Sequence, residues 1–138
     1  MPDTPALSIA FSVDLTLPYA EAVDAVTAAL KTEGFGVITR IDVQATLKEK
    51  LNVDFRPYVI LGACNPPLAY RALATEAQVG ALLPCNVTVE ATEAGSRVTF
   101  VNPQMMVAVP PLGDNPAMHA VAAEASDRFQ RVAAALRQ

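Results

Sequence analysis

The run from Tyr58 to Cys64 constrains the fold of this chain more than any other stretch. It reads Tyr-Val-Ile-Leu-Gly-Ala-Cys, so apolar residues do not alternate with polar ones. A strand of this kind is usually central in a sheet and covered on both faces. Asn65 and Pro66 follow directly, and an asparagine cap before a first-turn proline is a strong helix start. The run therefore predicts a buried strand that leads straight into a helix.

Two strand–helix units precede this run. Residues 8–15 alternate between apolar and polar, which indicates a half-buried strand. The helix that follows has an apolar residue at every third or fourth position, and Gly34 ends it. Asp42 then caps a short helix over 43–51. Between these helices lies a second strand, with four side chains expected on one face: Phe35, Val37, Thr39 and Ile41.

A helix, a hairpin and a loop come after the run. The helix is expected to reach about Val79, where Gly80 stops it. Residues 85–91 alternate again, and a turn over 93–96 pairs them with a strand over 97–101. In the proline-rich loop that follows, Met105 and Met106 are expected to fill the core or a dimer interface, because methionine adapts to irregular gaps.

The last helix begins at Asn115-Pro116 and reaches about Arg137, with one long apolar stripe. The order of elements is therefore β-α-β-α-β-α-β-β-α. This order predicts a single α+β domain over residues 1–138, with a mixed or antiparallel sheet and helices gathered on one face. A helix of about 20 residues is about 30 Å long, which is enough to cross such a sheet.

Charge and composition exclude some classes of partner. The formal net charge is −4, the ten basic residues are scattered, and the chain has no Trp. Nucleic-acid binding is disfavoured, because it needs a basic footprint or stacking platforms. Hydrophobic residues make up 52% of the chain and charged residues 17%. This balance favours a surface partly covered by another subunit.

Other features of the sequence indicate the cellular compartment of the protein. Residues Met1 to Ala6 lack a basic segment and a continuous apolar segment, so they do not resemble a signal peptide. No run approaches the roughly 18 apolar residues that span a bilayer. Two cysteines do not make a disulfide scaffold. We expect a soluble cytoplasmic protein with no membrane partner.

Three segments resemble the domain-of-unknown-function family 302, whose members are small bacterial and archaeal proteins. The segments are Ile41 to Lys50, Phe55 to Pro66 and Leu82 to Val87. The resemblance implies an α+β fold with a curved, mostly antiparallel sheet gripped by a long C-terminal helix, similar to the TATA-binding-protein-like class. It also implies a homodimer. It implies no established activity.

The two cysteines form the main candidate site, because each is followed by asparagine beside a structural boundary: Cys64-Asn65 and Cys85-Asn86. If the strands that carry Cys64 and Cys85 are antiparallel neighbours, the thiols lie at the same end. If those strands are parallel, the thiols lie at opposite ends. Two adjacent thiols could bind a soft metal such as Zn²⁺ or Cu⁺, or act in redox chemistry. Two thiolates do not complete a tetrahedral site, so further ligands would have to come from His119, Met105, Met106 or the cysteines of a second copy.

Simpler interpretations stand beside these. Both cysteines could be small buried hydrophobes, and Asn65 is explained by its role as a helix cap. Asn86 has no such explanation. His119, the only histidine, is expected at the edge of the last helix with a polar partner, although it could also act as a general base.

Three hypotheses follow. The first is a non-enzymatic homodimer that binds a small molecule or metal near the two Cys-Asn pairs, Cys64-Asn65 and Cys85-Asn86. The second is a thiol-dependent enzyme or redox protein that uses Cys64 or Cys85, with His119 as base. The third is a structural module without a ligand.

Overall fold

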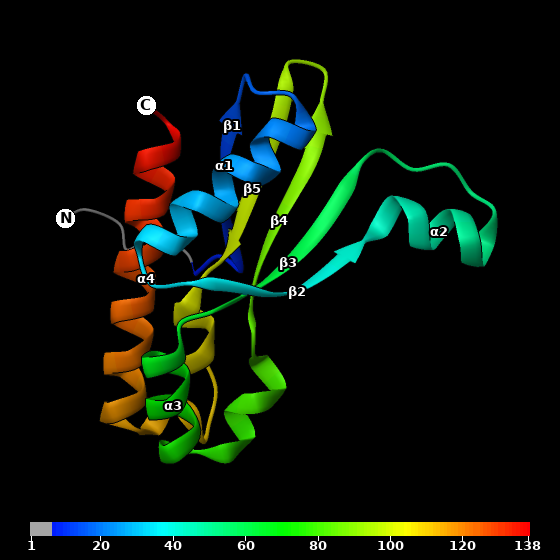
Figure 1. Cartoon of the computed structure of the whole chain (residues 1–138). Coiled ribbons are helices and arrows are strands. Elements are labelled where there is room, and N and C mark those ends of the chain that lie inside the picture. The colour runs from blue at the N-terminus through cyan, green and yellow to red at the C-terminus, as the bar shows by residue number, and fades with distance from the viewer. Residues whose placement is uncertain (1–6) are drawn as a thin grey trace.

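One open antiparallel sheet of five strands organises the chain (Figure 1). The structure is a computed structural model that describes residues 7–138. Each strand pairs only with antiparallel neighbours, so the sheet is antiparallel throughout rather than mixed. The strands lie in the order β1 (Ala10–Leu15), β5 (Gly95–Val101), β4 (Cys85–Thr92), β3 (Tyr58–Cys64) and β2 (Gly36–Asp42).

The helices confirm the predicted α+β order of elements, with short 3-10 helices added in the loops. The long C-terminal helix runs along the helical side of the molecule, as expected (Figure 1). The α-helices are α1 (Tyr19–Thr32), α2 (Val43–Leu51), α3 (Pro66–Thr75) and α4 (Pro116–Leu136), and the 3-10 helices are η1 (Ala77–Leu82), η2 (Pro103–Val107) and η3 (Leu112–Asp114).

The larger of two hydrophobic clusters lies between the sheet and the helices α1 and α4. We call it the sheet core. Its centre is aromatic: the ring of Phe129 lies 4.6 Å from that of Phe35 and 5.4 Å from that of Phe100. Around these rings, alternate side chains of four strands are buried, as their period of two predicts: Val13, Leu15, Val59, Leu61, Ala63, Val87, Val89, Val98 and Phe100.

A smaller cluster fills the space between α3, the three 3-10 helices and the N-terminal half of α4. We call it the helical core. It contains Leu68 and Ala72 of α3 together with Val79, Met106, Leu112, Met118, Val121 and Ala125. Met106 is buried here, in accordance with the expected core role, whereas Met105 is only partly buried.

In β3 and the helix after it, two predicted features differ from the structure. The helix after Pro66 ends at Thr75 and not at Val79, because Glu76 takes an extended conformation and its carboxylate accepts from the N–H of Gln78 to start η1. Gly80 therefore lies inside η1. The strand β3 is buried on the helical side, but Tyr58 and Ile60 on its other face are only partly buried. Coverage of β3 on both faces is thus incomplete.

The edge strand β2 and the helix α2 form an arm, in which β2 pairs with β3 and α2 stands away from the rest of the molecule (Figure 1). Asp42 caps α2 as predicted, by accepting from the N–H of Ala45 at 2.9 Å. No residue of α2 is buried.

Across residues 7–138, none of the helices combines the length and apolar content that crossing a membrane requires. The expectation about a signal peptide concerns residues 1–6, which lie outside the described residues.

Candidate functional site

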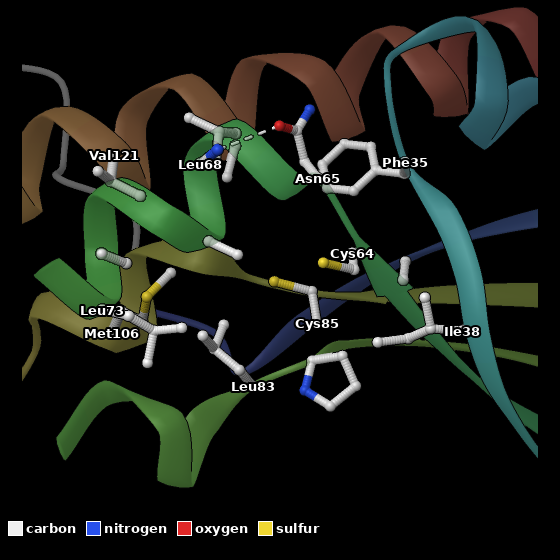
Figure 2. A pocket seen from close by; sticks show the side chains of 15 residues that line it. Phe35, Ile38, Cys64, Asn65, Leu68, Leu73, Leu83, Cys85, Met106 and Val121 are labelled. Carbon is white, nitrogen blue, oxygen red and sulfur yellow. Dashed lines mark hydrogen bonds between the residues drawn. The ribbon is translucent and has the colours of Figure 1, made fainter. Parts of the chain in front are cut away.

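A pocket of about 270 Å³ opens where β3 ends and α3 begins (Figure 2). The N-terminal turns of α3 form one wall, the ends of the strands form another, and Val121 and Ala125 of α4 lie at the back. No charged side chain lines it, and its lining is apolar apart from Asn65 and the two cysteines. The pocket lies beside the helical core.

The structure brings the two cysteines to the same end of the sheet. The strands β3 and β4 are antiparallel, and Ala63 lies opposite Cys85. Cys64 is therefore only one residue beyond the residue that faces Cys85. Both thiols are free and line the pocket. Figure 2 shows both sulfur atoms directed to the same side, toward α3. Of the two arrangements left open by the sequence, the antiparallel one is correct.

Burial changes the acidity of one of these thiols. Burial, together with a smaller effect of the nearby charge of Cys64, raises the pKa of Cys85 from its ordinary value of 9.0 to about 11. A thiol with this pKa is protonated near neutral pH, whereas a nucleophilic cysteine needs a lowered pKa. The surroundings of Cys85 do not favour the thiol-enzyme hypothesis.

Asn65 has the capping role that the sequence predicts, and it also joins two helices. Its side-chain oxygen accepts from the N–H of Leu68 at 3.2 Å, and its Nδ2 donates to the carbonyl of Glu33 at 3.3 Å. Pro66 and Pro67 have no N–H, and the N–H of Ala69 donates to the carbonyl of Asn65. The start of α3 therefore adds no free donor to the pocket wall.

Asn86 and His119 lie apart from the pocket. Asn86 faces Gly62 across the sheet, on the side away from the helices, and its side chain is exposed. His119 is exposed, and its Nε2 is 2.8 Å from the carbonyl oxygen of Gly113. This is the polar partner that the sequence predicts. Neither residue lines the pocket, so neither can act directly on a molecule bound there.

Sequence reasoning missed several lining residues, and Ile38 is the clearest. The register of β2 shifts between Val37 and Thr39, so Val37 lies opposite Ala63 while Thr39 lies opposite Gly62. The expectation that Val37 and Thr39 share one face is therefore wrong, because a bulge inserts an extra residue. Ile38 sits at this irregularity and contributes to the pocket rim. No residue type in this segment signals the bulge.

Among residues 7–138, no group of three or more His, Cys, Asp or Glu side chains is arranged to hold a metal ion. These residues therefore do not form a zinc site within one chain, because such sites use at least three protein ligands of this kind.

Comparison with known proteins identifies the family. A family model described as "Domain of unknown function DUF302" matches residues 11–136. The chain belongs to this family. A crystal structure of the uncharacterized conserved protein DUF302 from Bacillus stearothermophilus is similar to it, with 32% sequence identity and a TM-score of 0.79. The similarity covers 95% of this chain and 98% of the other. No curated protein matches the chain.

Proposed function

We propose that this chain is a non-enzymatic, homodimeric binding protein whose pocket takes a small apolar molecule. The observation that carries the proposal is the pocket itself, which is concave, lined almost entirely by apolar side chains and free of charged ones. Pockets of this kind are the usual sites for small molecules. The two free thiols are compatible with a reducing compartment such as the cytoplasm.

The volume of the pocket supports a ligand of modest size. A dry apolar cavity of about 150 Å³ holds a benzene molecule, and this pocket is larger, at about 270 Å³. Water inside it would find few hydrogen-bond partners, because Asn65 is its only amide and that amide is already bonded at both ends. Replacing such water by an apolar group is favourable.

The arm supports a homodimer. The strand β2 is an edge of the sheet, and its backbone presents unpaired groups on one side. Its apolar side chains are exposed, at 62% for Ile38 and 49% for Ile41, and Leu51 of α2 is 65% exposed. A twofold axis beside β2 would pair this edge with the same edge of a second copy, the usual arrangement of an isologous dimer.

Binding of a hydrophobic fluorescent dye, anilinonaphthalene sulfonate, tests the pocket. Ala69 of α3 lines the pocket, whereas Ala74 of the same helix is exposed and does not. We expect Ala69→Phe to fill the pocket and lower dye affinity at least tenfold, while Ala74→Phe leaves that affinity within twofold of the wild type. Equal affinities in the three proteins would refute an apolar binding site in this pocket.

Light scattering on a size-exclusion column tests the dimer. Ile41→Lys places a charge on the exposed face of the arm, and Ile9→Lys makes the same change beside β1, at the opposite edge of the sheet, where Ile9 is 73% exposed. We expect the wild type and Ile9→Lys to have the mass of a dimer and Ile41→Lys that of a monomer. A monomeric wild type would contradict the proposal.

A further inference from the structure

Three sulfur-bearing side chains, far apart in the sequence, meet at the pocket. Cys64 comes from the end of β3, Cys85 from the start of β4 and Met106 from η2. Figure 2 shows the sulfur atoms of the two cysteines near each other, with Met106 set apart from them, on the side of Leu73. The chain has only two cysteines, so its full set of thiols is gathered here.

The pocket offers few other ligands to a metal ion. None of its lining residues is a histidine, aspartate or glutamate. The side chain of Asn65 is occupied by its bonds to Leu68 and Glu33. Hard cations such as Mg²⁺ and Ca²⁺ require oxygen ligands, and Zn²⁺ requires four ligands. Thiolate and thioether sulfur instead suit soft ions such as Cu⁺.

The spacing of the two thiols suits an ion with two ligands. Directly opposed residues of antiparallel strands have Cα atoms about 4.5–5.5 Å apart, and Cys64 lies one residue beyond the position opposite Cys85. Two sulfur atoms bound to one ion are separated by about 4.6 Å at most, since a metal–sulfur bond is about 2.3 Å long. The register therefore places the two thiols on adjacent strands at neighbouring positions, which is the proximity that an ion with two ligands requires.

We infer that Cys64 and Cys85 bind one soft, two-coordinate cation, with Cu⁺ as the physiological example. Two thiols each lose a proton and one Cu⁺ enters, so the site gains one negative charge. This inference goes beyond the proposed function. The ion would bind to the thiolates of Cys64 and Cys85, whereas the proposed apolar ligand would fill the space of the pocket.

Competition with a chelator measures the site. The reduced, full-length protein is titrated with Cu⁺ without oxygen in the presence of bathocuproine disulfonate. We expect one Cu⁺ per chain and an affinity at least 100-fold lower for the double variant Cys64→Ser/Cys85→Ser. Ag⁺ is expected to behave like Cu⁺, and Zn²⁺ is expected to bind far more weakly. An affinity for Cu⁺ equal in the wild type and the double variant, or tighter binding of Zn²⁺ than of Cu⁺, would overturn the inference.

A second set of measurements guards against misfolding and separates the two proposals. The double variant Cys64→Ala/Cys85→Ala is measured in the same way, and each variant is checked for cooperative unfolding. X-ray absorption of the Cu⁺-loaded wild type should show sulfur neighbours only, and nitrogen or oxygen neighbours alone would contradict the site. Dye binding and Cu⁺ binding are both measured on the wild type, so that each proposal has a readout of its own. If the wild type binds Cu⁺ but does not bind the dye, the apolar ligand is refuted and the ion site remains supported.

Discussion

The sheet core and the helical core are both apolar, but the sheet core contains buried phenylalanine rings, whereas the helical core contains Met106 and Met118 and borders the pocket. In the sheet core, Phe100, Phe129 and Val89 are completely buried, and three aromatic rings contact one another in series. The helical core has fewer residues and borders the pocket of about 270 Å³. At the pocket rim, Leu73 remains 44% exposed.

This difference shows where stability and binding capacity lie. Closely packed interiors respond strongly to any change in volume, so the sheet core should carry most of the folding free energy. The helical core leaves room beside it, and this room is lined by α3, α4, η2 and the ends of the strands. Under the proposed function, a ligand would occupy this room beside the helical core.

The largest effect should come from Phe129→Ala. Its ring is completely buried among Phe35 and Phe100, and removing such a ring costs about 3–5 kcal/mol of unfolding free energy. The comparison variant at the pocket rim, Leu73→Ala, should lose less than about 1 kcal/mol of unfolding free energy, because the side chain of Leu73 is partly exposed. Urea denaturation measures both. Equal losses would show that Leu73 at the pocket rim is packed as closely as Phe129 in the sheet core.

The contrast between the two cores also decides what the sequence could predict. Most of the sheet core was predictable because strands such as β4 alternate, with Val87 and Val89 buried, and α1 has one apolar stripe. The α4 stripe was predictable for the same reason. These are local periodic signals, which depend on nothing beyond the element itself.

The pocket depends on non-local and irregular features, and it was only partly predictable. Asn65 and the cysteines were found because they stand at element boundaries. Asn86 and His119 were also chosen for their residue type, but the register of β4 and a bond to the carbonyl of Gly113 direct them elsewhere. Ile38 reaches the rim through a bulge, and Val121 comes from a distant helix. Spacing along the chain does not reveal such a meeting.

The next largest effect is the pH dependence of the unfolding free energy that comes from Cys85, which lies between the sheet core and the pocket. Burial raises the pKa of Cys85 to about 11 from 9.0, so the folded protein holds this proton more tightly than the unfolded chain. The stabilisation is complete below pH 9 and is lost as pH rises toward 11. It amounts to roughly 2–3 kcal/mol, since each pKa unit corresponds to about 1.4 kcal/mol.

Urea denaturation of the metal-free protein at pH 8 and pH 10.5 measures this loss. Other groups also titrate in that range, including Tyr19, whose pKa is raised chiefly by burial. Cys85→Ala is therefore the reference, and the wild type should lose more stability than this variant between the two pH values. Parallel losses in the two proteins would show that Cys85 is not buried as the structure indicates.

Two glycines allow a similar comparison of how closely the backbone is packed in two places. Gly95 has a φ of +154°, and a Cβ atom there would lie 2.3 Å from the carbonyl oxygen of Leu15. Gly36, at the start of β2 beside the pocket, has no heavy atom within 4 Å of such a Cβ. We expect Gly95→Ala to cost roughly 1–3 kcal/mol and Gly36→Ala to change stability by less than about 0.5 kcal/mol. Thermal unfolding compares the two, and a Gly36→Ala variant as unstable as Gly95→Ala would be inconsistent with this packing.

The smallest effect is the most informative about the pocket. Ala69→Phe adds a ring on the pocket side, where there is space beside α3, so we expect the unfolding free energy to change by less than about 1 kcal/mol. Ala133→Phe adds the same ring in the sheet core, where Ala133 is completely buried. There the ring should cost about 1–3 kcal/mol or more, because a full interior must distort to admit it. If Ala69→Phe were as costly as Ala133→Phe, the pocket would not exist as open space in solution. A tolerated Ala69→Phe that also loses its affinity for the dye would show that the same space is what a ligand occupies.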